Sequence, residues 1–246
     1  MSSKSTKAKK KSTAKNTGTT HIHMLLDRTG SMLDVKQETI NGVNLFIDQQ
    51  KKEKGEATFS LVQFDSQDPY EVLQDWVDIK KAKSLNEDTY NPRAMTPLLD
   101  AVGKAIRDVE AKIANKRTKK PDKIVMVIIT DGQENHSREF NREGIKKLIE
   151  EKEAADWRFV FIGADLDAFG EAGAFGLNCS ANNVMSASKS AQGMACMFLS
   201  TSAAMSGMRS ASVSEAKSMN FYSSSDYKKQ EDLGADNSKA AGSGTE

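Results

Sequence analysis

The chain is poor in cysteine, proline and aromatic residues, and what it lacks excludes several classes of protein. Its two cysteines, Cys179 and Cys196, form no Cys-x-x-Cys pair, which argues against a zinc cluster or a disulfide framework. No apolar run is long enough to be a transmembrane helix. The N-terminus has no apolar segment of the kind found in secretory signals. We therefore expect a soluble cytoplasmic protein with no membrane partner.

Neither sign of charge is in excess overall, because 35 Lys and Arg residues and 34 Asp and Glu residues leave a net charge of +1. Residues 1–19 nevertheless contain six lysines and no acidic residue, so subtracting six from +1 leaves −5 for residues 20–246. With almost no apolar side chains, residues 1–19 cannot bury enough surface to fold, and we expect a disordered basic arm. Nucleic-acid contact by this arm is open but less favoured than a solubilising role. The acidic remainder argues against a broad nucleic-acid surface.

From residue 20 onward, apolar runs alternate with amphipathic segments of helical period. Strands are expected at residues 21–27, 57–65, 71–79, 122–131 and 157–165. Helices are expected at residues 38–52, 96–116 and 141–156. This alternation predicts an α/β fold of the doubly wound, Rossmann-like type. Its central sheet is mostly parallel, with one antiparallel edge strand from residues 71–79 and helices on both faces.

Composition divides the chain into four parts. After the arm at 1–19, residues 20–178 form the α/β domain, 179–222 an Ala/Ser/Met-rich helical extension, and 223–246 a disordered tail. The small side chains of the extension suit packing on the domain edge or on another subunit. Self-association, or a place in a larger assembly, therefore stays open.

Oxygen-bearing side chains follow the first expected strand at alternate positions. Asp27 ends the run "HIHMLLD", and Thr29 and Ser31 come next in "DRTGSM". A sharp turn after the strand points alternate side chains towards one centre. In open α/β sheets, function lies at the carboxyl ends of the strands. We therefore expect Asp27 at a solvent-facing edge, where these three groups can serve as ligands.

Two other strands end in the same way, with Asp65 after residues 57–64 and Asp131 after "KIVMVIIT". Thr96 precedes a helix, where it also suits the helix N-cap, with Pro97 in the first turn. Carboxylates and hydroxyls without cysteine are hard ligands, which favour Mg²⁺, Mn²⁺ or Ca²⁺ over zinc. Asp65 is expected either behind this site or in solvent.

Three of these segments resemble the von Willebrand factor A domain family. They are "DRTGSM" at residues 27–32, "MTPLLDAV" at 95–102 and "VMVIITDGQEN" at 125–135, and they occur in the order seen in the family. The resemblance covers residues 20–178. The wider match, including "LVQFDSQDPYEV", resembles intracellular bacterial and bacteriophage members, which would make the protein cytoplasmic or, if encoded by a phage, a virion component.

The resemblance implies a metal-ion-dependent adhesion site. The implied metal residues are Asp27, Thr29, Ser31, Thr96 and Asp131. Ser31 would bind the ion directly and Thr96 when a ligand is engaged, whereas Asp27 and Asp131 would act mostly through water. Thr29 departs from the serine usual in the family but keeps the hydroxyl. An Asp or Glu of a partner protein would complete the coordination. Around the site we place Asp65, Gly30, Gly132 and His136.

Two other functions compete with metal-dependent protein binding. A Mg²⁺-dependent phosphatase of the haloacid-dehalogenase type also begins with a strand ending in Asp, but it needs a second Asp two residues later, where this chain has Thr29. A structural role in a phage particle is compatible with the binding function. His21 and His23 share one strand face, as metal ligands do, although paired polar residues at a strand entrance are the preferred interpretation.

Overall fold

A six-stranded sheet forms the centre of the computed structural model, which describes residues 16–115, 117–131, 134–164, 170, 172–173 and 182–232. The strand order is β3-β2-β1-β4-β5-β6, and only the pairing of β2 with β3 is antiparallel. The strands are β1 (Thr20–Asp27), β2 (Ala57–Phe64), β3 (Glu71–Asp78), β4 (Lys123–Thr130), β5 (Trp157–Gly163) and β6 (Val184–Ser186). The predicted mostly parallel sheet with one antiparallel edge strand is confirmed.

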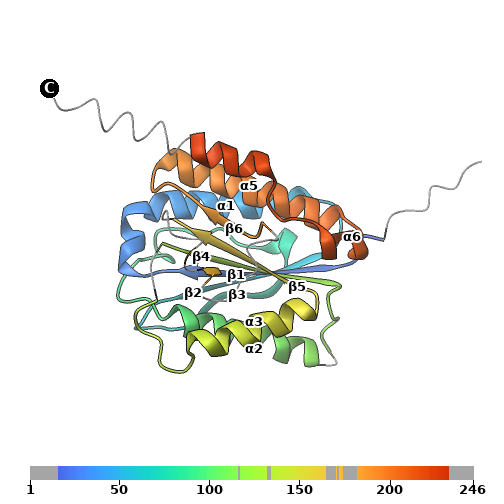
Figure 1. Cartoon of the computed structure of the whole chain (residues 1–246), viewed down its shortest axis with the longest axis horizontal. Helices are drawn as coiled ribbons and strands as arrows, with labels where there is room; N and C mark the ends of the chain where they lie inside the picture. Colours follow the sequence, from blue (N-terminus) through green and yellow to red (C-terminus); the bar gives the residue numbers. More distant parts are fainter. Residues whose placement is uncertain are drawn as a thin grey trace, which may run out of the picture.

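Helices cover both faces of this sheet (Figure 1). One face carries α1 (Lys36–Lys52), α5 (Ala191–Ser210) and α6 (Val213–Ser218), and the other carries α2 (Leu98–Ala114) and α3 (Arg142–Ala154). Two 3₁₀ helices, η1 (Gly30–Val35) and η2 (Ile79–Lys81), join the larger elements. Among the described residues, none of the helices has the length and apolar character to cross a membrane.

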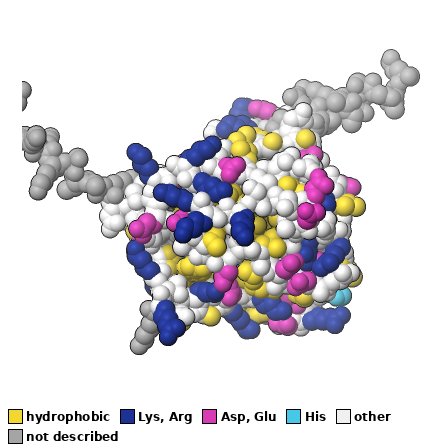
Figure 2. Space-filling view, turned by 180° about the vertical axis from the view of Figure 1, so that it is seen from behind, with side chains coloured by type: hydrophobic (Ala, Val, Ile, Leu, Met, Phe, Trp, Pro, Cys, Tyr) yellow, Lys and Arg dark blue, Asp and Glu magenta, His cyan; other side chains and the backbone are white. Residues whose placement is uncertain are grey.

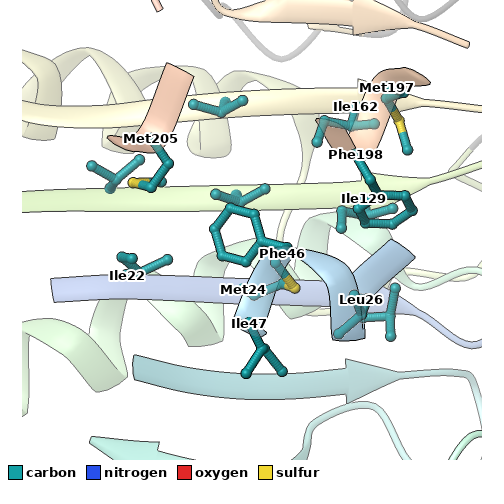
Figure 3. Close-up of a cluster of buried hydrophobic side chains, with 14 of the residues drawn as sticks. Ile22, Met24, Leu26, Phe46, Ile47, Ile129, Ile162, Met197, Phe198 and Met205 are labelled. Carbon is teal, nitrogen blue, oxygen red and sulfur yellow. The ribbon is translucent and has the colours of Figure 1, made fainter. Parts of the chain in front are cut away.

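The core lies on both sides of β1 and β4, whose residues are buried along their whole length. Apolar side chains of β1 alternate between the two faces. Ile22, Met24 and Leu26 pack towards α1 and α5, as Figure 3 shows, whereas Leu25 packs towards α2 and α3. The absence of alternation in the β4 sequence therefore reflects burial on both faces.

The helix α5 belongs to the same α/β sandwich as α1. Gly42 of α1 lies so close to the Phe198 ring that a Cβ atom there would be 1.9 Å from it. Gln50 donates to the Ser202 carbonyl at 3.0 Å, and the buried Arg209 donates to the Gln50 carbonyl at 2.6 Å. Of the two placements considered from sequence, α5 therefore takes the one on the domain itself.

Two parts of the predicted domain division differ from the structure. Strand β6 extends the central sheet beyond residue 178, so the sandwich continues into the segment that we set apart as an extension. The tail predicted to be disordered from residue 223 is helical over residues 224–232. There, the Tyr227 hydroxyl donates to the Val184 carbonyl at 2.9 Å. Residues 16–19 of the arm predicted to be disordered are described, and the Thr19 N–H donates to Asp122 at 2.7 Å. The rest of the arm, residues 1–15, and residues 233–246 of the tail lie outside the described residues.

Candidate metal centre

The carboxyl ends of three neighbouring strands bring the predicted aspartates to one edge of the sheet. Asp27 ends β1 and pairs in register with Phe64, the last residue of β2. On the other side, Leu26 pairs with Ile129 near the end of β4, so Asp27 lies level with Thr130. Parallel pairing thus places Asp27, Asp65 and Asp131 side by side although they are far apart in the chain.

Asp27 is fully buried, which corrects the expectation that it faces solvent. Its Oδ1 accepts from the Thr29 backbone N–H at 2.7 Å, and its Oδ2 accepts from the Thr130 hydroxyl at 2.6 Å. Burial, with a smaller contribution from the nearby charge of Asp131, raises the pKa of Asp27 to about 7 against these hydrogen bonds. A cation at this edge would relieve that cost.

Three predicted ligands form one hydrogen-bonded chain. The Ser31 hydroxyl donates to Asp131 Oδ1 at 2.6 Å, and the Thr29 and Ser31 hydroxyl oxygens are 3.3 Å apart. Ser31 is exposed, whereas Thr29 is buried and the Asp131 side chain is fully buried. The turn after β1 therefore places two adjoining hydroxyls beside Asp131, and the nearer one, that of Ser31, donates to its carboxylate.

Thr96 is held between the loops that carry the other ligands. The Gly30 backbone N–H donates to the Ala94 carbonyl at 3.1 Å, which ties the Thr96 segment to the β1 loop. On its other side, Thr96 exchanges hydrogen bonds with Asn135, whose side chain accepts from the Thr96 N–H at 2.9 Å. Thr96 is 3% exposed, so it too lies deeper than the solvent-facing edge that we expected.

The N-terminus of α2 is capped from the β4 loop, and the prediction that Thr96 caps it is wrong. The helix begins at Leu98 after Pro97, and the Glu134 carboxylate accepts from the Leu99 N–H at 2.9 Å. Glu134 also accepts from the His136 backbone N–H at 2.8 Å. His136 is half-buried in this turn. Gly132, also predicted for the rim, lies outside the described residues.

Asp65 anchors the loops and is not solvated. It is fully buried, with Arg28 Nε at 2.8 Å and Arg93 Nε at 3.0 Å from its Oδ2. Burial alone would raise the pKa of Asp65, but backbone N–H donors from Asp68 and Gln67 and the two arginines together lower it. The ionised carboxylate therefore holds Arg28, between the ligands Asp27 and Thr29, and the loop that leads to Thr96.

Two further residues at this edge, Tyr90 and Lys189, are not among the site residues predicted from the sequence. The buried Tyr90 donates its hydroxyl to the Asp27 carbonyl at 2.7 Å, fixing the end of β1. Lys189, in the loop before α5, places its Nζ 3.2 Å from Asp131 Oδ2. Tyr90 had a signal, since it is a single aromatic residue in the polar run "NEDTYNPR", but no motif marks Lys189.

His21 and His23 lie far from this edge in the body of β1, and both are fully buried. The His21 ring stacks on Trp76 with centroids 3.6 Å apart, and its Nδ1 is 2.9 Å from the Thr58 hydroxyl. His23 Nε2 is 3.5 Å from the Tyr70 hydroxyl. Among the described residues, no group of three His, Cys, Asp or Glu side chains could hold a metal ion. The histidines are therefore part of the packing, on the strand face predicted for both.

The donors at the carboxyl edge suit a hard divalent cation. Thr29 and Ser31 offer hydroxyls, and Asp27 and Asp131 offer buried carboxylates. Asp131 Oδ2 is buried, and within the described part of the chain its one described partner is the Lys189 ammonium. A buried carboxylate oxygen of this kind is costly without a cation beside it, so the residues present fit a metal ion.

Solved structures of low sequence identity share this fold. The VWA domain of SpRpn10 is 13% identical over 73% of this chain and 93% of that chain, with a TM-score of 0.51. A von Willebrand factor type A protein from Catenulispora acidiphila is 11% identical over 79% of this chain and 43% of that chain, with a TM-score of 0.52. Proximal thread matrix protein 1 from the mussel byssus, solved with a zinc-occupied MIDAS motif, is 14% identical over 78% of this chain and 47% of that chain, with a TM-score of 0.50. The chain thus spans under half of the last two.

A comparison with curated proteins finds no match. The family model for the von Willebrand factor type A domain matches residues 21–199, well over half of the chain. The match runs past residue 178 through β6 into α5, in agreement with the continuous sandwich. The chain therefore belongs to the von Willebrand factor type A domain family.

Proposed function

We propose that this domain binds a partner protein through a divalent metal ion held at the carboxyl edge of its sheet. The proposal rests on one observation, the chain of Thr29, Ser31 and Asp131 oxygens, which joins two loops distant in sequence. Asp27 stands behind these oxygens, and Thr96 is fixed between the same two loops. In this family such a metal-ion-dependent adhesion site (MIDAS) is known for protein binding, and the mussel protein has been solved with zinc there.

An acidic side chain of the partner is the chemistry that the site would take. The neutral hydroxyls of Thr29, Ser31 and Thr96 would leave a bound Mg²⁺, Mn²⁺ or Ca²⁺ ion electrophilic, so that a carboxylate from outside can join the coordination. Ser31 is exposed and lies at the entrance. The buried carboxylates behind it hold charge without blocking that entrance.

Apolar side chains beside the metal residues support a protein partner. Four large apolar side chains of the described chain are markedly exposed, and two of them flank this site. Leu33, 61% exposed, follows Ser31, and Met95, 47% exposed, precedes Thr96. The hydrogen bond between Gly30 and Ala94 brings these segments together. We infer that the partner presents an Asp or Glu next to an apolar residue.

We propose binding in preference to catalysis. Both carboxylate oxygens of Asp27 accept hydrogen bonds inside a fully buried environment, which is a poor arrangement for a phosphatase nucleophile. Acidic and basic side chains are interspersed over the face in Figure 2, so that face has no broad basic surface for nucleic acid. An intracellular bacterial or phage setting stays a proposal based on the sequence resemblance.

The test is a pull-down with the full chain in Mg²⁺ or in EDTA, with Ser31→Ala as the site variant. Ser31 is preferable to Asp27 because its side chain is exposed, so the change leaves the core intact. A specific partner should be retained in Mg²⁺, lost in EDTA, and lost with Ser31→Ala. Partners bound equally in all three conditions would contradict the proposal.

A further inference from the structure

Lys189 brings a positive charge of the chain itself into the proposed metal site. Its Nζ lies 3.2 Å from Asp131 Oδ2, a buried oxygen for which no other partner is described. The Asp131 side chain is fully buried and that of Lys189 is 41% exposed, so the ammonium approaches from the solvent side. The other Asp131 oxygen is already occupied by Ser31. The ammonium is thus a counter-ion of this buried carboxylate.

The backbone around Lys189 is fixed independently of this ion pair. The Ala187 N–H donates to the Gly163 carbonyl at 2.8 Å, which attaches the loop to the sheet. Ser190 caps α5 by accepting from the Gly193 N–H at 3.1 Å. Gly193 lies so close to Ser188 that a Cβ atom would be 2.5 Å from its carbonyl oxygen. The Lys189 side chain can therefore leave Asp131 while the loop stays in place.

We propose that Lys189 is the resident cation of the metal-free site and that a divalent ion binds by displacing its ammonium from Asp131. This inference rests on the proposed metal site and adds how the site is controlled. A divalent ion and an ammonium a few ångströms apart repel each other strongly where water is excluded. Metal binding must therefore break the ion pair. The apparent metal affinity is the intrinsic affinity multiplied by the fraction of molecules in which Lys189 is away from Asp131, so a more stable ion pair means weaker metal binding.

The first test compares Mg²⁺ and Mn²⁺ affinities of the wild type and Lys189→Gln by calorimetry. The displacement predicts that Lys189→Gln binds about three- to tenfold more tightly, since the competitor is gone. Lys217→Gln is the matched control. Lys217 is 50% exposed and pairs with Asp156, just before β5 and so at the opposite edge of the sheet. Its loss removes the same charge and should leave the affinity unchanged.

The second test measures the reactivity of the Lys189 amine in the wild-type protein. A short pulse of an acetylating reagent, followed by mass spectrometry, should modify Lys189 faster when Mg²⁺ is saturating, because the amine is then free of Asp131. Lys217 in the same sample reports any general effect of Mg²⁺ and should react at a constant rate. This measurement detects the displacement of the Lys189 amine directly. A long-range effect of charge could change the metal affinity in the first test, but it would not free the amine.

The outcomes separate this inference from the proposed metal site. Equal metal affinity in the wild type and Lys189→Gln, or Lys189 reactivity unchanged by Mg²⁺, would overturn the displacement while leaving the site intact. Tighter binding by Lys217→Gln to the same degree would also overturn it, since the effect would then be one of net charge. Absence of metal binding in both proteins would refute the metal site and this inference with it.

Discussion

Polar residues occur at alternate positions within strand β1 and again just after it, and the two sets have different surroundings. His21 and His23 are sealed between the sheet and its aromatic neighbours, with the His21 ring against Trp76. Thr29 and Ser31 lie just after the end of the strand, where the Thr29 hydroxyl contacts that of Ser31 and the Ser31 hydroxyl donates to Asp131, the residue after β4. Alternation therefore tells which face a side chain takes. Its distance from the carboxyl end of the strand decides whether it can meet a ligand.

The histidine pair in β1 and the aspartates at the carboxyl edge also differ in their electrostatics. Burial lowers the pKa of His23 to about 4 and lowers that of His21 well below its usual range, so both rings are neutral at pH 7. Burial also raises the pKa of Asp27, but there the neighbouring Asp131 adds to the effect. The histidines form a region that excludes charge, and the aspartates form one that needs a cation.

The largest effect should come from the core between the two regions. Ile128 of β4 pairs in register with Leu25 of β1 and is 1% exposed. Ile128→Ala should lower the free energy of unfolding by ~2–5 kcal/mol through lost burial and a cavity. Denaturant titration would measure it, with exposed Leu199→Ala as the control. A loss no larger than that of the control would mean that the sheet is not packed as described.

Ser31→Ala breaks the site and leaves the histidine region intact. Removing the hydroxyl that bridges Thr29 and Asp131 should weaken Mn²⁺ binding about 10–100-fold, or ~1.4–2.7 kcal/mol, with little change in stability. Ser214→Ala, an exposed serine of α6, is the control for calorimetry. Equal heats of binding for the two variants would remove Ser31 from the site.

Acidification should act on the histidine region. Because His23 has a lower pKa in the folded state than in the unfolded state, the unfolded chain binds more protons between pH 6.5 and pH 4. Stability is fully present above pH 6.5 and declines as the pH falls to about 4. His23 alone should cost roughly 2 kcal/mol between pH 7.5 and pH 5.

The measurement is denaturant unfolding of the wild type and His23→Leu at both pH values. The variant should lose that much less stability on acidification, whatever its stability at pH 7.5. His136→Gln, which changes a half-buried loop histidine, should keep the wild-type difference. If His23→Leu shows the full wild-type loss, His23 is not the group that responds to pH.

The smallest effect should be that of His136 on the metal site. The hydrogen bond described for His136 is donated by its backbone N–H to the Glu134 side chain, and a change of the His136 side chain preserves this backbone donor. His136→Ala should therefore change Mn²⁺ affinity by less than about twofold, against the 10–100-fold expected for Ser31. A loss comparable to that of Ser31→Ala would place the imidazole in the site.

The sequence was sufficient to predict β1 to β5, the antiparallel edge strand and the gathering of Asp27, Thr29, Ser31 and Asp131, but not β6. These depend on local pattern and on the topology of parallel sheets, both of which are encoded in short segments. The depth of Asp27 was not predictable, because it depends on Tyr90 and on the loops that close over it.

The contributions of Glu134 and Lys189 were not predictable either. Glu134 takes the capping role expected of Thr96 from a loop 35 residues away from Leu99. Lys189 reaches Asp131 only because β6 and α5 belong to the domain, whereas composition suggested a separate extension. Partners at long range in sequence leave no periodic signal, so such contacts require the three-dimensional structure.

The most direct test of the metal site is diffraction at the manganese absorption edge from crystals of the full chain grown with Mn²⁺. The account predicts one anomalous peak at the carboxyl edge of the sheet, about 2.1 Å from the Ser31 hydroxyl, with Thr29, Thr96, Asp27 and Asp131 around it. A peak at His21 and His23, or none at the carboxyl edge with Mn²⁺ in excess, would contradict it.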